Sequence, residues 1–431
     1  MLARMRLLWT RIRDSLWFLP GVFTLVAALL AVAVTEADRV GMFEVDVLRS
    51  WIFSGGVDGA RGVLQAITGG LITVIGVVFS VTIVALQLAS SQFTPRVLRN
   101  FTSDRGNQLV LAVFIGTFTY TLLVLRTVRS AEDGEEPFIP RVAVTLAVVL
   151  VLVAIGFLIF FINHSARSIQ VAAILDRVSK RTLAHVRHLF PEPVGHGDDA
   201  VPAGDLAAEW ATVTGSAAGY LQAVDGKGLF ELGKGRSLVI VMEPALGDFV
   251  LPGEPLARVS PPGAVDEELC AGVRKAFLLG PERTPGQDVA FGLTEIADIA
   301  VKALSPGIND PTTAVQCIDR LAEILLELGT RSPPRPWRTE EGKVHYLARE
   351  LAFERAVTVA FEQIRHFGAS NPVVARALLG ALGRLDARVP AGRRAVLREQ
   401  ADALLHDARA RIDNARDLAG IEHSAGWVRN G

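Results

Sequence analysis

The feature that most constrains this chain is Gly62–Pro95, a run of 34 consecutive residues without one charged side chain. A helix rises about 1.5 Å per residue, so this run would reach roughly 50 Å. The hydrocarbon core of a bilayer is only ~30 Å thick. The run therefore predicts a membrane-spanning helix that continues beyond one face of the bilayer.

One side of this predicted helix is small and polar. At about 100° per residue, its small and polar residues fall within one arc, and larger aliphatic residues lie outside that arc. Ile83 and Val84 interrupt the arc near its edges. Its members are Gly62, Gln65, Ala66, Gly69, Thr73, Gly76, Ser80, Gln87 and Ser91. This stripe indicates that something other than lipid contacts this side of the helix.

Two interpretations of the stripe remain open. Glycine, alanine and serine let helix backbones approach closely, which is typical of helix packing in membranes. Alternatively, the stripe lines a pore in a homo-oligomer, where hydroxyl and amide groups replace part of an ion's hydration shell. The candidate pore-lining or packing residues are Gly69, Thr73, Gly76, Ser80, Gln87 and Ser91.

Three further apolar segments meet or approach the ~20 residues that a spanning helix needs. They are Leu16–Thr35, Leu109–Leu125 and Val142–Ile162. The first is long for the apolar core of a signal peptide, so we interpret it as a retained helix. The arginines that flank the spans favour an orientation with both termini in the cytoplasm. The lipid bilayer is then one expected partner.

The mean hydropathy of +0.35 hides two dissimilar halves. Together they predict a membrane α-helical fold with a cytoplasmic α+β region. We expect a four-helix transmembrane domain over residues 1–163, and a juxtamembrane helix and linker over 164–204. A small β-barrel-like domain over 205–265 and a helical cytoplasmic domain over 266–431 follow. The start of the second segment, residues 164–190, is amphipathic and is interpreted as a stalk near the headgroups.

The predicted β domain has short apolar runs separated by Gly, Pro and Asp, as in small all-β units. The runs are Tyr220–Val224, Ser237–Met242 and Pro255–Val259. Gly247–Leu256 resembles the turn-and-strand motif of biotinyl/lipoyl-type barrel-sandwich domains. The lysine that those domains modify has no counterpart in Ala257–Ser260. A structural or ligand-sensing barrel is therefore expected, and no cofactor.

Beyond the β domain, the spacing of apolar residues predicts a helix over Gln287–Leu304, which Pro306 and Gly307 end. Asp310 is typical of an N-cap with Pro311 at the first helical position, opening a helix over Thr312–Leu328. Further helices are expected over Tyr346–Phe367, Pro372–Leu385 and Ala391–Ala415.

The segment Ala303–Ala314, with its string Ser-Pro-Gly-Ile-Asn-Asp-Pro, resembles the signature of a bacterial family of predicted membrane proteins, domain of unknown function 2254. Ala85–Arg96 at the end of the second span supports the match, as do Gln363–Arg365 and Asn371. The resemblance covers nearly the whole chain. It implies an inner-membrane protein with four spans and a cytoplasmic region, and it carries no activity.

The carboxylates Asp288, Glu295 and Asp298 share a face of the first of these helices. Three interpretations remain open. The carboxylates form a solvated or salt-bridged face, or they bind a hard cation or regulatory ligand together with Asn309, or they act catalytically. The choice of metal stays open. The turn that follows is a cap or an interface that couples to the membrane. The residues of this candidate interface or ligand site are Asp288, Glu295, Asp298, Ser305, Pro306, Gly307, Asn309, Asp310 and Pro311.

Other motifs argue against enzymatic or nucleic-acid function. Gly228–Lys234 has the spacing of a Walker loop but lacks its Ser or Thr, so we predict a pair of turns there. The two cysteines, Cys270 and Cys317, give no metal signature. A net charge of −1 offers no electrostatic basis for nucleic-acid binding. No nucleophile motif is present, and we expect a protein that is not an enzyme.

These observations favour a homo-oligomeric ion channel of the bacterial inner membrane. The second span would line the pore, and the cytoplasmic region would gate or assemble it. The alternative is a membrane-anchored sensor or scaffold whose cytoplasmic region binds a ligand or partner.

Overall fold

The computed structural model describes residues 15, 17–40, 42, 52–92, 104–130, 137–168, 170–190, 209–332, 337–340, 343–349 and 351–429. Its chain forms two compact units, Met1–Gln170 and Val171–Gly431.

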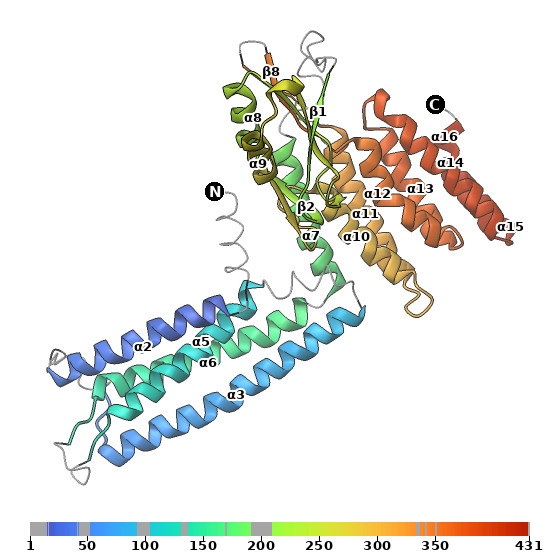
Figure 1. Cartoon of the computed structure of the whole chain (residues 1–431). Helices are drawn as coiled ribbons and strands as arrows, with labels where there is room; N and C mark the ends of the chain where they lie inside the picture. Colours follow the sequence, from blue (N-terminus) through green and yellow to red (C-terminus); the bar gives the residue numbers. More distant parts are fainter. Residues whose placement is uncertain are drawn as a thin grey trace. The chain divides into compact units, whose positions relative to one another are not determined.

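Among its described residues, the first unit has four long apolar helices, each long and apolar enough to cross a membrane, which confirms the four predicted spans at that level. The second of these continues past the length a bilayer requires, as its sequence predicts. They are α2 (Phe18–Arg39), α3 (Val57–Gln92), α5 (Arg105–Thr127) and α6 (Arg141–Ser168) (Figure 1).

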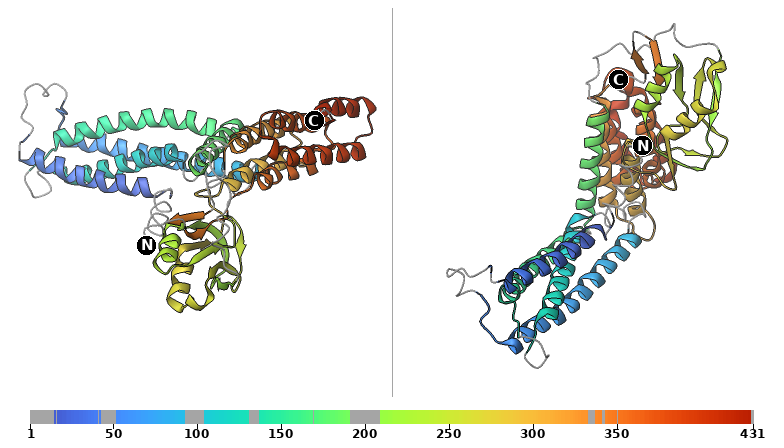
Figure 2. Two further views of the ribbon diagram at one scale, coloured as in Figure 1. Left: turned by 90° about the horizontal axis from the view of Figure 1, so that it is seen from above. Right: turned by 60° about the vertical axis from the view of Figure 1, so that its left-hand side comes forward.

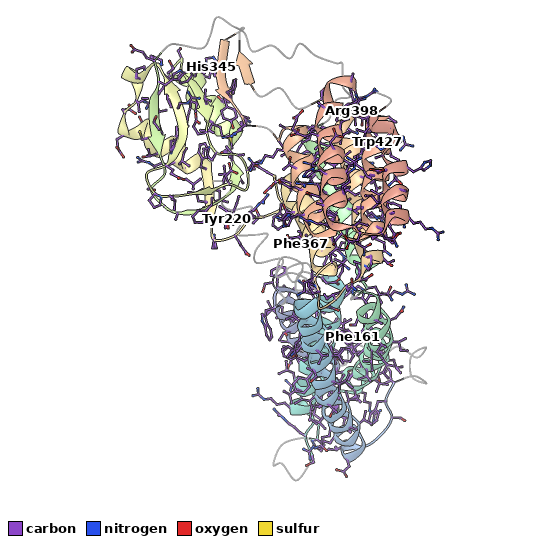
Figure 3. All side chains as sticks on the ribbon, turned by 90° about the vertical axis from the view of Figure 1, so that its right-hand side faces the viewer. Phe161, Tyr220, His345, Phe367, Arg398 and Trp427 are labelled. Atoms are coloured by element: carbon purple, nitrogen blue, oxygen red, sulfur yellow. The ribbon has the colours of Figure 1, made fainter. Side chains whose placement is uncertain are left out.

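Helix α5 is the centre of this unit. It packs against the other three helices and is 56% buried over its most apolar window, whereas the others are 17–22% buried. Tyr120 and Phe114 of α5 are fully enclosed, and Phe161 of α6 packs in the same cluster as Phe114 (Figure 3). Most of the surface of α2, α3 and α6 is therefore left for lipid or for other protein.

Carboxylates at the helix ends fix how these helices meet. Asp38, near the end of α2, accepts hydrogen bonds from the Val142 and Ala143 N–H groups at 3.0 and 3.1 Å, so it caps α6. Asp104 caps α5 through the Gly106 N–H at 2.8 Å. The same Asp104 oxygen lies 2.8 Å from His164 Nε2 in α6. Each cap thus also ties two helices together.

The second unit contains two sheets, whose strand orders are β1-β5-β3-β8-β7 and β4-β2-β6. Every pair is antiparallel except β3 with β8. Their apolar core is closed by α8 (Gly226–Gly235) and α9 (Glu267–Ala276). The strands are β1 (Ala211–Thr214), β2 (Gly219–Val224), β3 (Val239–Met242), β4 (Phe249–Val250), β5 (Pro255–Ser260), β6 (Phe277–Gly280), β7 (Trp337–Glu340) and β8 (Lys343–Leu347).

The predicted runs correspond to β2, β3 and β5, but the barrel-sandwich is not confirmed, because the described strands form no closed barrel. Strands β7 and β8 come from far along the chain and extend one sheet, whereas the residues from Tyr346 on were predicted to start a helix. The turns predicted at Gly228–Lys234 are wrong. Asp225 accepts the Gly228 N–H at 3.0 Å and starts helix α8 there.

The rest of this unit is a layered group of helices (Figure 2). The three predicted helices after residue 340 are present, but the first starts later and the last is broken into shorter pieces. The helices are α7 (Val171–Leu189), α10 (Val289–Ala303), α11 (Pro311–Gly329), α12 (Phe353–Gly368), α13 (Pro372–Asp386), α14 (Arg394–Arg411), α15 (Ala415–Ser424) and α16 (Gly426–Arg429).

Helix α7 is a core helix of this group, so its interpretation as a stalk is wrong. Its apolar side, including Leu175, Val178 and Val186, is buried against α10 and α11. Asp176 pairs with Arg320 at 3.6 Å and Arg187 with Glu327 at 3.0 Å, so α7 and α11 run in the same direction. The amphipathic pattern was visible in the sequence, and the structure identifies the helices that cover it.

The close contact of α7 with α10 depends on Gly292. A Cβ atom at this position would overlap the side chain of Thr182, which is itself buried. We therefore expect Gly292→Ala to lower the free energy of unfolding by about 2 kcal/mol through overpacking. Gly263→Ala is the matched control, because a Cβ there meets nothing within 4 Å. Denaturant unfolding of both variants checks this, and equal stabilities would contradict it.

Candidate functional site

The small and polar stripe of α3 is exposed in the chain. Gly69, Thr73, Gly76, Ser80 and Gln87 are all exposed. Ser91 lies in the last turn of the helix, where the structure does not describe side chains. A Cβ atom on any of the stripe glycines Gly62, Gly69 and Gly76 would meet nothing within 4 Å. The structure gives these glycines no close helix contact within one chain.

A different face of α3 makes the contacts within the chain. Leu64, Leu71, Val78 and Ala85 are buried and recur every seven residues. Beside the stripe, Ile72, Val77 and Phe79 are large, apolar and exposed, which suits lipid. Helix α3 therefore has a face that packs within the chain, a small polar face, and exposed apolar residues that suit contact with lipid.

The small polar face has the spacing of a helix–helix seam. From Gly62 to Ser80 its residues follow at alternating intervals of four and three, as in a heptad repeat. Thr73 Oγ1 donates to the Gly69 carbonyl at 3.1 Å, and Ser80 Oγ donates to the Gly76 carbonyl at 2.8 Å. Each hydroxyl hydrogen is thus used, whereas the hydroxyl oxygen keeps lone pairs that can accept a bond or contact a cation.

A groove lies next to this face, between α3, α5 and α6. It has a volume of about 360 Å³ and an almost wholly apolar lining. Ala66 belongs both to the groove and to the stripe, with Gly70 and Leu71 lining the groove one turn further along. The exposed side of α3 therefore offers a hollow apolar surface beside its small residues.

The carboxylates of α10 face into the second unit. Asp288 caps α10 through the Phe291 N–H at 3.0 Å and pairs with Arg283, whose Nη2 lies 2.7 Å away. Glu295 is 1% exposed and pairs with Arg181 of α7. Asp298, one turn on, is half-buried. The face is salt-bridged, as one interpretation expected, but it is largely buried and not solvated.

These carboxylates do not converge. Asp288 and Glu295 are two turns apart, and each has its own arginine. Among the described residues, no group of three or more His, Cys, Asp or Glu side chains is placed to hold a metal ion. Burial raises the pKa of Asp288, and Arg283 and the helix N–H groups oppose that rise. The cost of burying the Asp288 carboxylate at the start of α10 is thus partly offset by Arg283 and the helix N–H groups.

The turn after α10 forms the predicted cap. Asp310 accepts the Thr313 N–H at 3.1 Å and the Thr313 hydroxyl at 2.5 Å, and Pro311 begins α11. Asn309 has φ of 48°, a conformation that asparagine tolerates. Pro306 and Gly307 are exposed. Ser305 Oγ donates to the Lys302 carbonyl at 2.7 Å. The turn follows the last residue of α10, Ala303, so it lies at the opposite end of that helix from Asp288.

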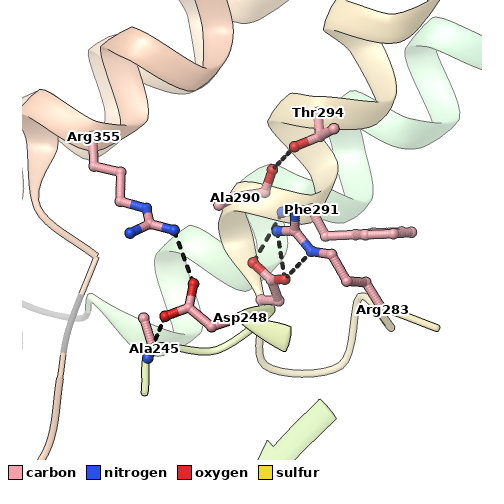
Figure 4. A network of polar contacts seen from close by, with 8 residues as sticks. Ala245, Asp248, Arg283, Ala290, Phe291, Thr294 and Arg355 are labelled. Carbon is pink, nitrogen blue, oxygen red and sulfur yellow. Dashed lines mark hydrogen bonds and ion pairs between the residues drawn. The ribbon is translucent and has the colours of Figure 1, made fainter. Parts of the chain in front are cut away.

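The structure also forms a cavity of about 200 Å³ that the sequence did not reveal. Figure 4 shows part of the polar network beside it, including Arg283 and Arg355. Asp288 lines the cavity together with Arg283, Arg349 and Arg355. The signal that could have found it is Gly247, which has φ of 84° and lies where a Cβ would overlap Asp288 and Arg283. Arg349 and Arg355 are more than fifty residues from Asp288, and no local pattern connects them.

Four candidate spans followed by a mixed helical and β unit define a multi-pass membrane protein. Comparison with known families makes this more specific. Residues 13–384 match the model of the predicted membrane protein family DUF2254, and the chain belongs to this family.

Two mycobacterial relatives match almost the whole chain. The uncharacterized protein Mb1321c of Mycobacterium bovis is 34% identical over 437 residues, covering 98% of this chain and 81% of its own length. The uncharacterized protein Rv1290c of Mycobacterium tuberculosis matches with the same identity and coverage. No solved structure is significantly similar. The family and relatives thus establish a predicted membrane protein and leave its role to the residues.

The cap at Asp310 predicts a pH-dependent contribution to stability. The hydroxyl and N–H of Thr313 lower the pKa of Asp310 below its ordinary value of 3.8. The free energy that the Asp310 cap contributes to folding is therefore fully present above pH 3.8. It is lost as the pH falls through the lower pKa that Asp310 has in the folded state. We expect Asp310→Ala to cost about 1 kcal/mol near neutral pH, and less in strong acid.

Denaturant unfolding of the wild type and Asp310→Ala at several pH values checks this cap. Asp310→Asn keeps a capping oxygen without its titration, so its stability near neutral pH should stay close to that of the wild type. A difference between wild type and Asp310→Ala that grew on acidification would contradict the argument.

Proposed function

We propose that this protein is a homo-oligomeric ion channel in which α3 lines the conducting path. The observation that carries the proposal is the exposure of the small and polar face along the described length of α3. The bacterial inner membrane, with both termini in the cytoplasm, is the location that goes with this proposal.

Assembly through this face follows from how helices associate in lipid. Lipid tails are as apolar as leucine, so association depends on close van der Waals packing and polar contacts between helices. Gly62, Gly69 and Gly76 permit such packing, and nothing within the chain occupies the space beside them. A second copy of α3 has the matching small surface and the heptad spacing that a seam requires.

Conduction is supported by the polar atoms on the same face. Thr73, Ser80 and Gln87 are exposed and seven residues apart, or roughly 10 Å along the helix axis. In a ring of identical subunits each would repeat around the axis as a layer of oxygen atoms that can replace hydration water. No acidic or basic side chain lies within this stretch of α3, so a passive path fits better than proton-coupled transport.

The test is to record currents from purified full-length protein in planar bilayers. We expect conductance in the wild type, and a loss of at least tenfold in Thr73→Leu and Ser80→Leu, since leucine fills the lumen and removes the oxygen. Ile72→Leu and Val77→Leu are matched controls, because both residues are exposed and apolar and flank the stripe, one on either side. They should conduct as the wild type does.

The mass of the protein in detergent supplies an independent measurement. A multimer in the wild type that dissociates in Gly69→Leu and Gly76→Leu supports assembly through this face. A monomer without current, at any voltage or membrane tension, overturns the proposal. The alternative, a membrane-anchored sensor or scaffold, would tolerate Thr73→Leu and Ser80→Leu, and the arginine-lined cavity of the second unit favours it.

A further inference from the structure

The cavity of the second unit lies where three parts of that unit meet. One wall is the turn Ala245–Gly247 between β3 and β4, and the other walls are the starts of α10 and α12. The last residues of α7, Leu189 and Phe190, close one side. Its polar end and its apolar side, which includes Leu246, Leu351 and Val359, come from segments far apart in the sequence.

The charges around the cavity do not balance. Arg283 is used by Asp288, with bonds of 3.0 and 2.7 Å to the same oxygen. Arg355 Nη2 lies 3.0 Å from Asp248, whose other oxygen accepts the Ala245 N–H (Figure 4). Arg349 donates to the Glu243 carbonyl, and within the described part of the chain it contacts no carboxylate. Among the described side chains, the exposed guanidinium of Arg349 therefore has no carboxylate partner.

The two helix starts at the cavity differ in their caps. Helix α10 is capped by Asp288, which accepts the Phe291 N–H. Helix α12 begins after Ala352, which has no side-chain oxygen and makes no capping hydrogen bond. The first N–H groups of a helix carry partial positive charge, and a side-chain cap, water or a bound anion can satisfy them. This uncapped start lies beside Arg349 and includes Arg355, and Glu354 of the same first turn is exposed.

The surrounding groups hold the cavity in shape. Gln287 accepts the Val224 N–H at 3.0 Å and donates to the Val224 carbonyl at 3.4 Å, so it joins the start of α10 to strand β2. Gly247 lies against the Asp288–Arg283 pair with no room for a side chain. Arg331, just after the end of α11, donates to the Phe190 carbonyl at 2.9 Å, which offsets the negative end of α7 there.

We propose that this cavity binds a small phosphorylated metabolite, whose phosphate contacts Arg349, Arg355 and the start of α12. Arginine forks match the geometry of phosphate oxygens, and each guanidinium keeps donors beyond those used in the contacts above. The apolar part of the ligand packs against Leu246, Leu351 and Val359. The site is independent of the proposed pore, since all its residues belong to the second unit.

The experiment is calorimetric titration of full-length protein in detergent at constant ionic strength. The probes are inorganic phosphate, which tests the charged end alone, and AMP, which adds an apolar ring. We expect saturable binding of AMP with a Kd of about 1 mM or tighter, and weaker binding of inorganic phosphate. Absence of binding for both probes overturns the proposal.

Two variants locate the binding. Arg349→Gln should weaken AMP binding at least tenfold, whereas Arg388→Gln, an exposed arginine that does not line the cavity, should leave it unchanged. Ala352→Asp provides the missing cap and places a carboxylate where the phosphate would lie. It should raise the Tm and still abolish binding, a combination that unfolding cannot produce. Wild-type affinity in Arg349→Gln or in Ala352→Asp would refute the assignment.

Discussion

The buried ion pair between Arg181 of α7 and Glu295 of α10 is the interaction on which the second unit depends. Glu295 is 1% exposed, so its charge is tolerated only because the guanidinium lies against it. The pair sets the position of α10 along α7, next to the glycine contact at Gly292. Asp288, at the start of α10, lies against Arg283 and the turn at Gly247. The start of α10 in turn forms one wall of the cavity.

The sequence predicted those features whose cause is local. The periodicity of α3 placed its stripe on one face, because about 100° per residue suffices to compute that face. Asp310 and Pro311 identified the start of α11 for a similar reason, since the cap involves only the next three residues. The amphipathic pattern of α7 was equally visible. What the pattern did not reveal was its partner, and the charged side that was assigned to headgroups pairs instead with Arg320 and Glu327.

Features that depend on distant residues were missed or misassigned. The carboxylates of α10 share a face in the sequence, but the partner of Glu295 is Arg181, which comes from α7 more than a hundred residues earlier. The barrel-sandwich expectation rested on residues near Gly247, whereas β8 pairs with β3 from about a hundred residues further on. The arginines of the cavity have no shared motif. Only the packing of α12 near the β3–β4 turn brings them together.

The two candidate sites, the small polar face of α3 and the arginine-lined cavity, differ in the kind of partner that would complete them. The face of α3 is complete without polar partners, because Thr73 and Ser80 bond their own helix, so what it lacks is a surface to pack against. The cavity is lined by three arginines and the carboxylate of Asp288, and the exposed Arg349 has no carboxylate partner among the described residues. A second copy of the chain can supply a packing surface for α3, but a matching small surface supplies no anion to the cavity. An exposed packing face on α3 together with an arginine-lined cavity is better explained by an assembly that responds to a soluble anion than by a membrane anchor alone.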